Sequence, residues 1–167
     1  EMFDKITAQG QHPRAKFDTF IMLETIGHEL DKEVEIEYRK YKEYINDGSA
    51  ITKKIEENLD IATIIRKSES IWDGGYVIAG MIGHGDSFVF RDNKGIRTAF
   101  YYADEEAVVI ASERPVIQTA MNVECSEIKE LLPGQILIIK KNGELKFEEI
   151  RPPAKEVTPC SFERIYF

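Results

Sequence analysis

The chain has 167 residues, of which 43% are hydrophobic and 31% are charged. These are ordinary values for a folded globular protein, and they argue against wholesale disorder. The net charge of -8 disfavours a nucleic-acid-binding protein, because a phosphate backbone requires a basic surface. No apolar run approaches the roughly 20 residues needed to cross a bilayer, and the first residues lack the features of a signal peptide. The two cysteines are too few for a disulfide framework, so we expect a cytoplasmic protein. From its charge and the lack of a long apolar run, we expect no nucleic-acid and no membrane partner.

The first third of the chain has helical periodicity. Asp18 or Thr19 can cap a helix. The charged stretch 31–43 either continues this helix or forms a second, more exposed one. Its apolar residues recur at steps of three and four, which predicts a buried face made of Phe20, Leu23, Ile26, Leu30 and Val34. The sequence Asn-Asp-Gly-Ser at 46–49 breaks the pattern. A further helix is predicted over 51–65.

From Trp72 onward the period is that of β-strands. Residues 76–82 and 87–91 form a predicted hairpin around Gly-His-Gly-Asp, and residues 100–102 and 107–111 form a second strand pair. A short helix is expected to start at Pro115 and to run to Met121. Residues 135–140 and 144–149 flank Asn-Gly, a strong hairpin signal. Helices first and antiparallel hairpins afterwards predict an α+β layered domain.

Both ends of the sequence are abrupt. Residue 1 is not methionine, and residues 162–167 include apolar and aromatic side chains at which a natural terminus seldom lies. We therefore expect a piece of a longer polypeptide. Since half of a layered fold would leave sheet edges uncovered, we also expect self-association or marginal stability of the isolated piece.

Four segments of the second half, in this order, resemble the glutaminase domain of amidophosphoribosyltransferases. Residues 81–97 end a strand in Arg-Asp and lead to Gly-Ile-Arg, and residues 109–113 match an Ala-Ser-Glu strand end. Residues 132–135 resemble a Pro-Gly-Glu turn, with Gln135 in place of the usual acid. Residues 159–167 resemble the segment that joins this domain to a phosphoribosyltransferase domain. The boundaries that follow are 1–157 for the second part of the glutaminase domain and 158–167 for the start of the connection.

The resemblance implies a function as well as a fold. Members of this family hydrolyse glutamine in an N-terminal-nucleophile domain built as an α-β-β-α sandwich. The ammonia passes to a second domain and displaces pyrophosphate from phosphoribosyl pyrophosphate, which gives 5-phosphoribosylamine for purine synthesis. Expected partners of the parent protein are therefore glutamine and phosphoribosyl pyrophosphate, in a homo-oligomer.

The family's nucleophile is a cysteine at the mature N-terminus, whose own amino group can serve as the base. Residue 1 of this chain is Glu, and Cys125 and Cys160 are internal. The family's arginine and Asn-Gly oxyanion segment should also precede this piece. We expect the isolated chain to contain no catalytic residues and to be inactive.

Asp18 is the candidate substrate-binding residue. In the family, an aspartate at a helix start holds the α-ammonium group of glutamine, and Phe-Asp-Thr-Phe at 17–20 resembles that position. A carboxylate is the natural partner of an ammonium group, and a helix N-terminus keeps it ionised. The alternative is that Asp18 is only a helix cap.

Other polar residues have more ordinary interpretations. His84 lies in a turn, where an exposed histidine without a catalytic role is expected. Arg91, Asp92 and Arg97 could bind an anion, but buried charges that fix a loop between strands are the better interpretation. His12 and His28 lack metal-ligand spacing, so no zinc site is expected.

Cofactors are expected only in the parent. In some members of the family a cysteine corresponding to Cys160 ligates a 4Fe–4S cluster with three cysteines of the second domain; others have the cysteine without a cluster. One ligand cannot hold a cluster, so the present chain should be metal-free, and we do not expect a cluster in the parent. The resemblance implies Mg²⁺ in the phosphoribosyltransferase domain.

Two rival interpretations remain open. Another class II amidotransferase, of the glucosamine-phosphate synthase type, shares the sandwich and the Arg-Asp loop. A catalytically dead domain that binds a metabolite or a partner is the non-enzymatic rival.

Overall fold

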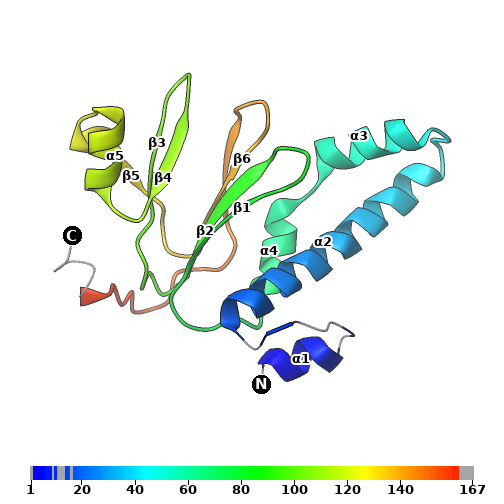
Figure 1. The fold of residues 1–167 in the computed structure, drawn as a ribbon, viewed down its shortest axis with the longest axis horizontal. Coiled ribbons are helices and arrows are strands. Elements are labelled where there is room, and N and C mark those ends of the chain that lie inside the picture. The colour runs from blue at the N-terminus through cyan, green and yellow to red at the C-terminus, as the bar shows by residue number, and fades with distance from the viewer. Residues whose placement is uncertain (1, 9, 11–13, 16, 162–167) are drawn as a thin grey trace. The chain divides into compact units, whose positions relative to one another are not determined.

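A computed structural model describes residues 2–8, 10, 14–15 and 17–161. The chain divides into two compact units, Glu1–Asp73 and Gly74–Phe167. The first unit is helical and the second contains all strands of the described chain (Figure 1). The predicted α+β class, with helices first and antiparallel hairpins afterwards, is confirmed.

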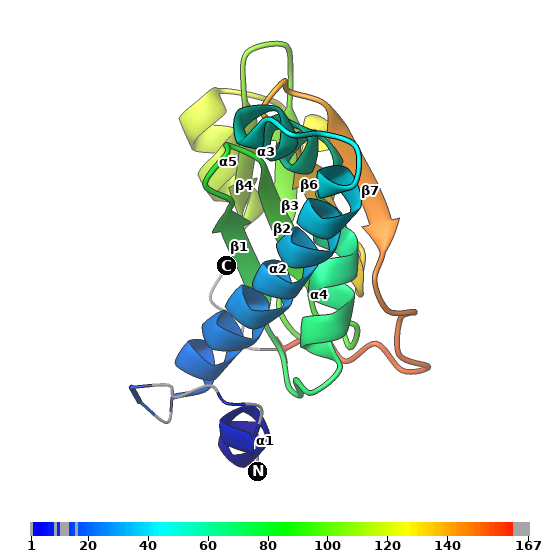
Figure 2. The same ribbon diagram turned by 90° about the vertical axis from the view of Figure 1, so that its right-hand side faces the viewer.

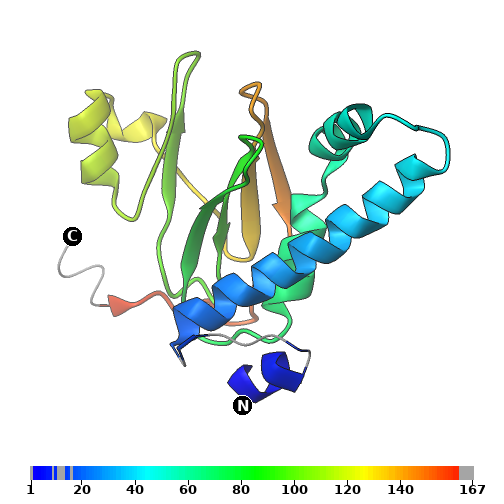
Figure 3. The same ribbon diagram turned by 45° about the vertical axis from the view of Figure 1, so that its right-hand side comes forward.

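The first unit contains four helices among its described residues: α1 (Met2–Ala8), α2 (Asp18–Lys42), α3 (Gly48–Asn58) and α4 (Ile61–Glu69). The single helix predicted over 51–65 is wrong, because it divides into α3 and α4 (Figure 3). Asp60 causes the division: its carboxylate accepts hydrogen bonds from the amide (2.9 Å) and the hydroxyl (2.8 Å) of Thr63. Asp47 caps α3 in the same way, through the amide of Ser49. An aspartate that caps a new helix ends the previous one.

The predicted buried face of α2 is also wrong in part. Ile21 and Thr25 are buried, whereas Leu23 is 64% exposed and Phe20 is 40% exposed. The neighbouring helix α4 packs against α2, and the hydroxyl of Ser68 on α4 lies 3.5 Å from the carbonyl of Thr25. Apolar residues occur on more than one side of α2, so periodicity alone did not identify the side that faces α4.

The second unit contains two antiparallel sheets. Strands β1 (Val77–Met81), β2 (Ser87–Arg91), β6 (Gln135–Ile139) and β7 (Leu145–Glu149) form one sheet in the order β1-β2-β6-β7. Strands β3 (Phe100–Ala103), β4 (Val108–Ala111) and the two-residue β5 (Lys129–Glu130) form the other in the order β4-β3-β5. All three predicted strand pairs are confirmed. Gly143, in the turn between β6 and β7, has a φ of 87°, which explains the need for Asn-Gly.

The two sheets pack on a shared core. Val89 and Leu137 of the first sheet contact Ala99 and Leu131, which flank strands of the second. Helix α5 (Arg114–Met121) packs on β3 and β4, and it is followed by the 3-10 helix η1 (Cys125–Glu127). The predicted helix at Pro115 is confirmed, one residue earlier than expected. The unit therefore supplies β-β-α layers of the kind expected from an α-β-β-α sandwich.

None of the described helices combines the length and the apolar character that crossing a membrane requires.

Candidate functional site

The loop that follows β2 is fixed by two buried, oppositely charged side chains. The guanidinium of Arg91 donates to the carbonyls of Arg97 (2.6 Å), Leu131 (2.6 Å) and Gly95 (3.4 Å). The carboxylate of Asp92 accepts from the amides of Ile96 (3.1 Å), Arg97 (3.2 Å) and Tyr76 (3.3 Å). The structural interpretation of Arg91 and Asp92 is confirmed. The expectation of burial is wrong for the side chain of Arg97, which is exposed; the bonds to Arg91 and Asp92 involve its backbone carbonyl and amide.

The Pro-Gly turn contacts this loop directly. The amide of Gly134 donates to the carbonyls of Arg91 and Asp92, at 3.1 Å in each case. Gly134 has a φ of 75°, and a Cβ atom built on it would lie 1.9 Å from the carbonyl oxygen of Arg151. No residue with a side chain fits this position without backbone movement.

The other two segments of the resemblance reach the same loop. The amide of Cys160 donates to the carbonyl of Ile96 at 3.2 Å, and the hydroxyl of Thr98 donates to the carbonyl of Ser112 at 2.8 Å. Residues 162–167 of the last segment lie outside the described residues. All four sequence segments thus meet around residues 91–98, although up to about 60 residues separate them in the sequence.

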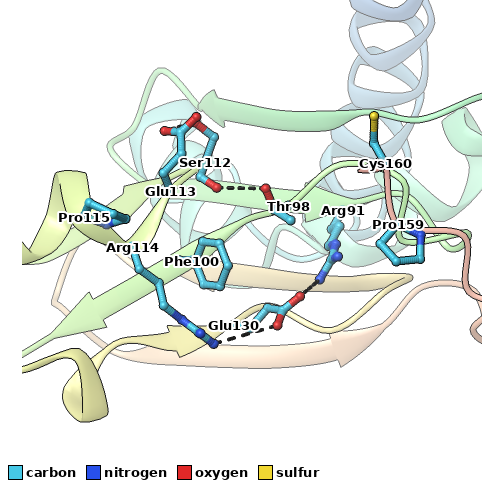
Figure 4. Close-up of a pocket in the computed structure, with 10 residues that line it drawn as sticks. All are labelled: Arg91, Thr98, Phe100, Ser112, Glu113, Arg114, Pro115, Glu130, Pro159 and Cys160. Atoms are coloured by element: carbon cyan, nitrogen blue, oxygen red, sulfur yellow. Dashed lines mark hydrogen bonds and ion pairs between the residues drawn. The ribbon is translucent and has the colours of Figure 1, made fainter. Parts of the chain in front are cut away.

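A pocket of about 360 Å³ lies beside this loop, within the second unit (Figure 4). Glu130 lies between two arginines: its Oε1 is 2.7 Å from Arg91 Nη1 and its Oε2 is 3.9 Å from Arg114 Nη2. The guanidinium carbon of Arg114 lies 4.6 Å from the centre of the Phe100 ring. The remaining lining residues are Thr98, Ser112, Glu113, Pro115, Pro159 and Cys160.

The polar residues of the pocket are paired with one another and are not arranged for catalysis. The charge of Arg91 is compensated by Glu130, so the anion-binding alternative for this arginine loses its basis. The hydroxyl of Ser112 donates to its neighbour Glu113 at 2.5 Å. None of the described residues that line the pocket carries an imidazole that could activate Cys160. Sequence reasoning missed Glu130 and Arg114. A buried arginine signals the need for a carboxylate partner, but the sequence does not indicate which of 30 acidic residues provides it.

Asp18 is the first residue of α2 and is exposed. The residue in the capping position is Phe17, and no side-chain hydrogen bond caps this helix. The cap interpretation of Asp18 is therefore wrong, because Phe17 and not Asp18 occupies the capping position of α2. Its carboxylate remains available to a ligand at the positive end of a helix of 25 residues. Binding of glutamine by Asp18 stays a prediction.

His84 differs from the expectation of an exposed turn residue. Its side chain is only 8% exposed, and its Nε2 atom lies 3.0 Å from Oδ2 of the buried Asp86. Lys140 Nζ and the amide of Lys141 donate hydrogen bonds to the Asp86 carboxylate. Burial opposes ionisation of this carboxyl, but its interactions with Lys140, His84 and Lys141 outweigh this effect, so the pKa of Asp86 lies below its usual value. His84, Asp86 and Lys140 therefore connect the turn of the β1-β2 hairpin with that of the β6-β7 hairpin, two turns that lie far apart in the sequence.

Metal binding has little support in the described residues. They contain no group of three His, Cys, Asp or Glu side chains placed to hold a metal ion. Cys160 has no second cysteine beside it in the pocket lining. His12 lies outside the described residues.

Comparisons with known proteins show the fold. No protein-family model and no curated protein matches the chain. Among solved structures, glutamine phosphoribosylpyrophosphate (PRPP) amidotransferase from B. subtilis, complexed with ADP and GMP, matches with a TM-score of 0.63 and 21% identity over 98% of this chain. A structure described as the allosteric regulatory enzyme of purine biosynthesis matches with a TM-score of 0.65 and 20% identity, also over 98%. The chain shares the α+β fold of these enzymes and spans 29% and 28% of their lengths.

Proposed function

We propose that this chain is the second part of the glutaminase domain of an amidophosphoribosyltransferase. One observation carries the proposal: the four segments that resemble this family meet at a single loop. The fold around this loop is shared with glutamine phosphoribosylpyrophosphate amidotransferase and with a structure described as an enzyme of purine biosynthesis. Charged residues, glycines and turns that are far apart in the sequence all contact the same loop, at residues 91–98. Chance matches to short motifs would not be expected to converge in this way.

The proposed reaction has two steps. Water cleaves the side-chain amide of glutamine to give glutamate and ammonia, by way of a thioester on a leading cysteine. Ammonia then displaces pyrophosphate from phosphoribosyl pyrophosphate and forms 5-phosphoribosylamine. Residue 1 is Glu, and Cys125 and Cys160 are internal, so the 167 residues do not include the cysteine that this step requires.

Within this scheme, the residues of the present chain have supporting tasks. Asp18 binds the α-ammonium group of glutamine through a charge-assisted hydrogen bond, at the first residue of α2. Arg91 and Asp92 hold the loop from which the connection to the second domain departs, through the bond from Cys160 to Ile96. Mg²⁺ bound in the phosphoribosyltransferase domain would neutralise the pyrophosphate of the second substrate.

The direct test is an assay of the complete polypeptide that contains these residues. Purified protein is supplied with phosphoribosyl pyrophosphate, Mg²⁺ and either glutamine or ammonium chloride, and pyrophosphate release is measured. Release with both nitrogen sources supports the proposal. Glutamine-dependent amination of fructose 6-phosphate instead of phosphoribosyl pyrophosphate would identify the glucosamine-phosphate synthase type, and inactivity with every acceptor would favour a binding domain.

A further inference from the structure

Two guanidinium groups share one carboxylate in the pocket of the second unit. Oε1 of Glu130 lies 2.7 Å from Nη1 of Arg91 and accepts a hydrogen bond from it. Oε2 of Glu130 lies 3.9 Å from Nη2 of Arg114, which is too far for a hydrogen bond. The single negative charge is therefore held mainly by Arg91, and the positive charge of Arg114 is only weakly compensated.

Arg114 is also the residue of the lining with the most unused donors. A guanidinium has five N–H groups, and in the part of the chain that the structure describes none of those of Arg114 has a hydrogen-bond acceptor. Its Nε atom is buried, so an incoming molecule cannot reach it. The side chain as a whole is 43% exposed, which leaves the terminal nitrogens available to an acceptor.

The guanidinium of Arg114 is held in place before any ligand binds. Its central carbon lies 4.6 Å from the centre of the Phe100 ring, a cation–π contact (Figure 4). Its backbone is the start of α5, which packs beside β4 (Figure 2). A binding group that is already oriented loses little conformational entropy when a ligand arrives, and this favours affinity.

The second acidic residue of the lining does not compensate Arg114. Oε2 of Glu113 accepts the hydrogen bond of the Ser112 hydroxyl at 2.5 Å. Within the described residues, the ion pair of Arg114 is with Glu130 and none joins it to Glu113. The pocket thus keeps an excess of positive charge at Arg114, while Glu113 would repel an anion that carries more than one negative charge.

The walls of the pocket are partly apolar. The cavity of about 360 Å³ is lined by Phe100, Pro115 and Pro159 beside the charged residues. Binding sites for small molecules combine apolar walls with a few polar groups that fix the orientation of the ligand. A hydrated inorganic ion would leave this apolar surface uncovered, whereas a short hydrocarbon body would cover it.

We infer that this pocket binds a small organic monocarboxylate. Its carboxylate accepts charge-assisted hydrogen bonds from the terminal nitrogens of Arg114, and its apolar part contacts Phe100 and Pro159. The inference does not depend on the proposed function, because Arg114 and Phe100 have no task in the proposed reaction.

Ligand-observed NMR of the complete protein tests the inference. Propionate is titrated at constant ionic strength, and saturation transfer to its methyl group gives the dissociation constant. Propionamide has nearly the same shape without the charge, so it should bind roughly 10- to 100-fold more weakly, as expected for the loss of hydrogen bonds to a charged group. Equal binding of the two compounds would overturn the inference.

Inorganic phosphate separates a carboxylate site from a general anion site. Phosphate at the same ionic strength should not displace propionate, because it carries a higher charge and lacks an apolar body. Displacement by phosphate at concentrations below the dissociation constant of propionate would overturn the assignment to carboxylates.

Two glutamine variants locate the site. Arg114→Gln removes the proposed donor, and Lys129→Gln removes the same charge from an exposed residue of β5 that does not line the pocket. Propionate should bind Arg114→Gln roughly 10- to 100-fold more weakly, and its affinity for Lys129→Gln should be unchanged. Equal affinities for the two variants would contradict the assignment to Arg114.

Chemical modification of the unsubstituted protein avoids any effect of a variant on folding. Phenylglyoxal reacts with accessible guanidinium groups, and peptide mass analysis reports the rate at each arginine. Saturating propionate should slow the modification of Arg114 several-fold and leave that of Arg151, an exposed residue outside the pocket lining, unchanged. An unchanged rate at Arg114 would overturn the inference.

Discussion

Arg91 and Asp92 are neighbours in the chain, yet their side chains bind the same loop from opposite sides. Arg91 Nε donates to the carbonyl of Arg97 at 2.6 Å, and Asp92 Oδ1 accepts from the amide of Ile96 at 3.1 Å. Side chains alternate along a strand, so an Arg-Asp pair at a strand end can reach both sides of the segment that follows. This relationship explains why the pair occurs before Gly-Ile-Arg in the present sequence.

Replacement of Arg91 by lysine should destabilise the chain. Lysine preserves the charge near Glu130 but cannot reach the carbonyls of Arg97 and Leu131 together, because its donors sit on one atom. Each buried carbonyl left without a donor costs about 1–3 kcal/mol, so urea denaturation should show a loss of roughly 2–4 kcal/mol. Arg151→Lys, at an exposed position, is the control and should change stability little. Equal effects of the two variants would contradict a special role for Arg91.

Gly134 and Gly143 form a matched pair for a steric test. Both have positive φ angles, 75° and 87°, but a Cβ on Gly134 would meet the Arg151 carbonyl, whereas a Cβ on Gly143 would meet nothing within 4 Å. Gly143→Ala should cost about 1–2 kcal/mol from backbone strain alone. Gly134→Ala should cost several kcal/mol more, or prevent folding, as judged by thermal melting. Similar melting temperatures for the two variants would refute the close approach of the turn to residue 151.

The interaction of Asp86 with Lys140 predicts that the stability of the chain decreases at low pH. The folded-state pKa of Asp86 is lowered, so its contribution is present above the unfolded pKa of about 3.9 and is lost as the pH falls through the folded value. The stability difference between the native chain and Asp86→Asn should therefore shrink as the pH drops below about 4. Denaturation series at several pH values measure this.

Lys140→Met serves as the companion variant. Removal of the lysine takes away the strongest interaction that favours the ionised carboxylate, so the acid dependence attributed to Asp86 should become weaker. An unchanged pH profile in Lys140→Met would show that this lysine does not stabilise the carboxylate.

The 167-residue chain alone should release no ammonia from glutamine. Cys160 and Cys125 are internal and combine no thiol with a free amine in one residue, which the proposed chemistry requires. A coupled glutamate dehydrogenase assay measures the ammonia. Turnover that survives repurification and disappears in Cys160→Ser or Cys125→Ser would contradict this prediction.

Much of the fold could be predicted from local sequence signals. Asn-Gly at 142–143 and Gly-His-Gly-Asp at 83–86 indicate hairpins, and β-branched residues indicate the strands between them. The buried face of α2 could not be predicted, because it depends on which side of the helix α4 covers. The break at Asp60 was missed because an apolar pattern continues across a capping aspartate.

The candidate site was predictable only where a motif marked it. The Arg-Asp pair and Pro-Gly turn are visible in the sequence, whereas Glu130 and the Asp86–Lys140 pair depend on contacts between distant residues. The burial of His84 follows from its proximity to Asp86, which a turn pattern does not reveal.

The most direct test of the proposed function is a comparison of nitrogen sources in Asp18→Asn of the complete polypeptide. The loss of a hydrogen bond to a charged group costs about 1.5–3 kcal/mol, so the KM for glutamine should rise roughly 10- to 100-fold while ammonia-dependent formation of 5-phosphoribosylamine is unchanged. Asp31→Asn, an exposed position on the same helix, should leave both activities as they are. An equal loss of the two activities in Asp18→Asn, or no change in either, would contradict the account.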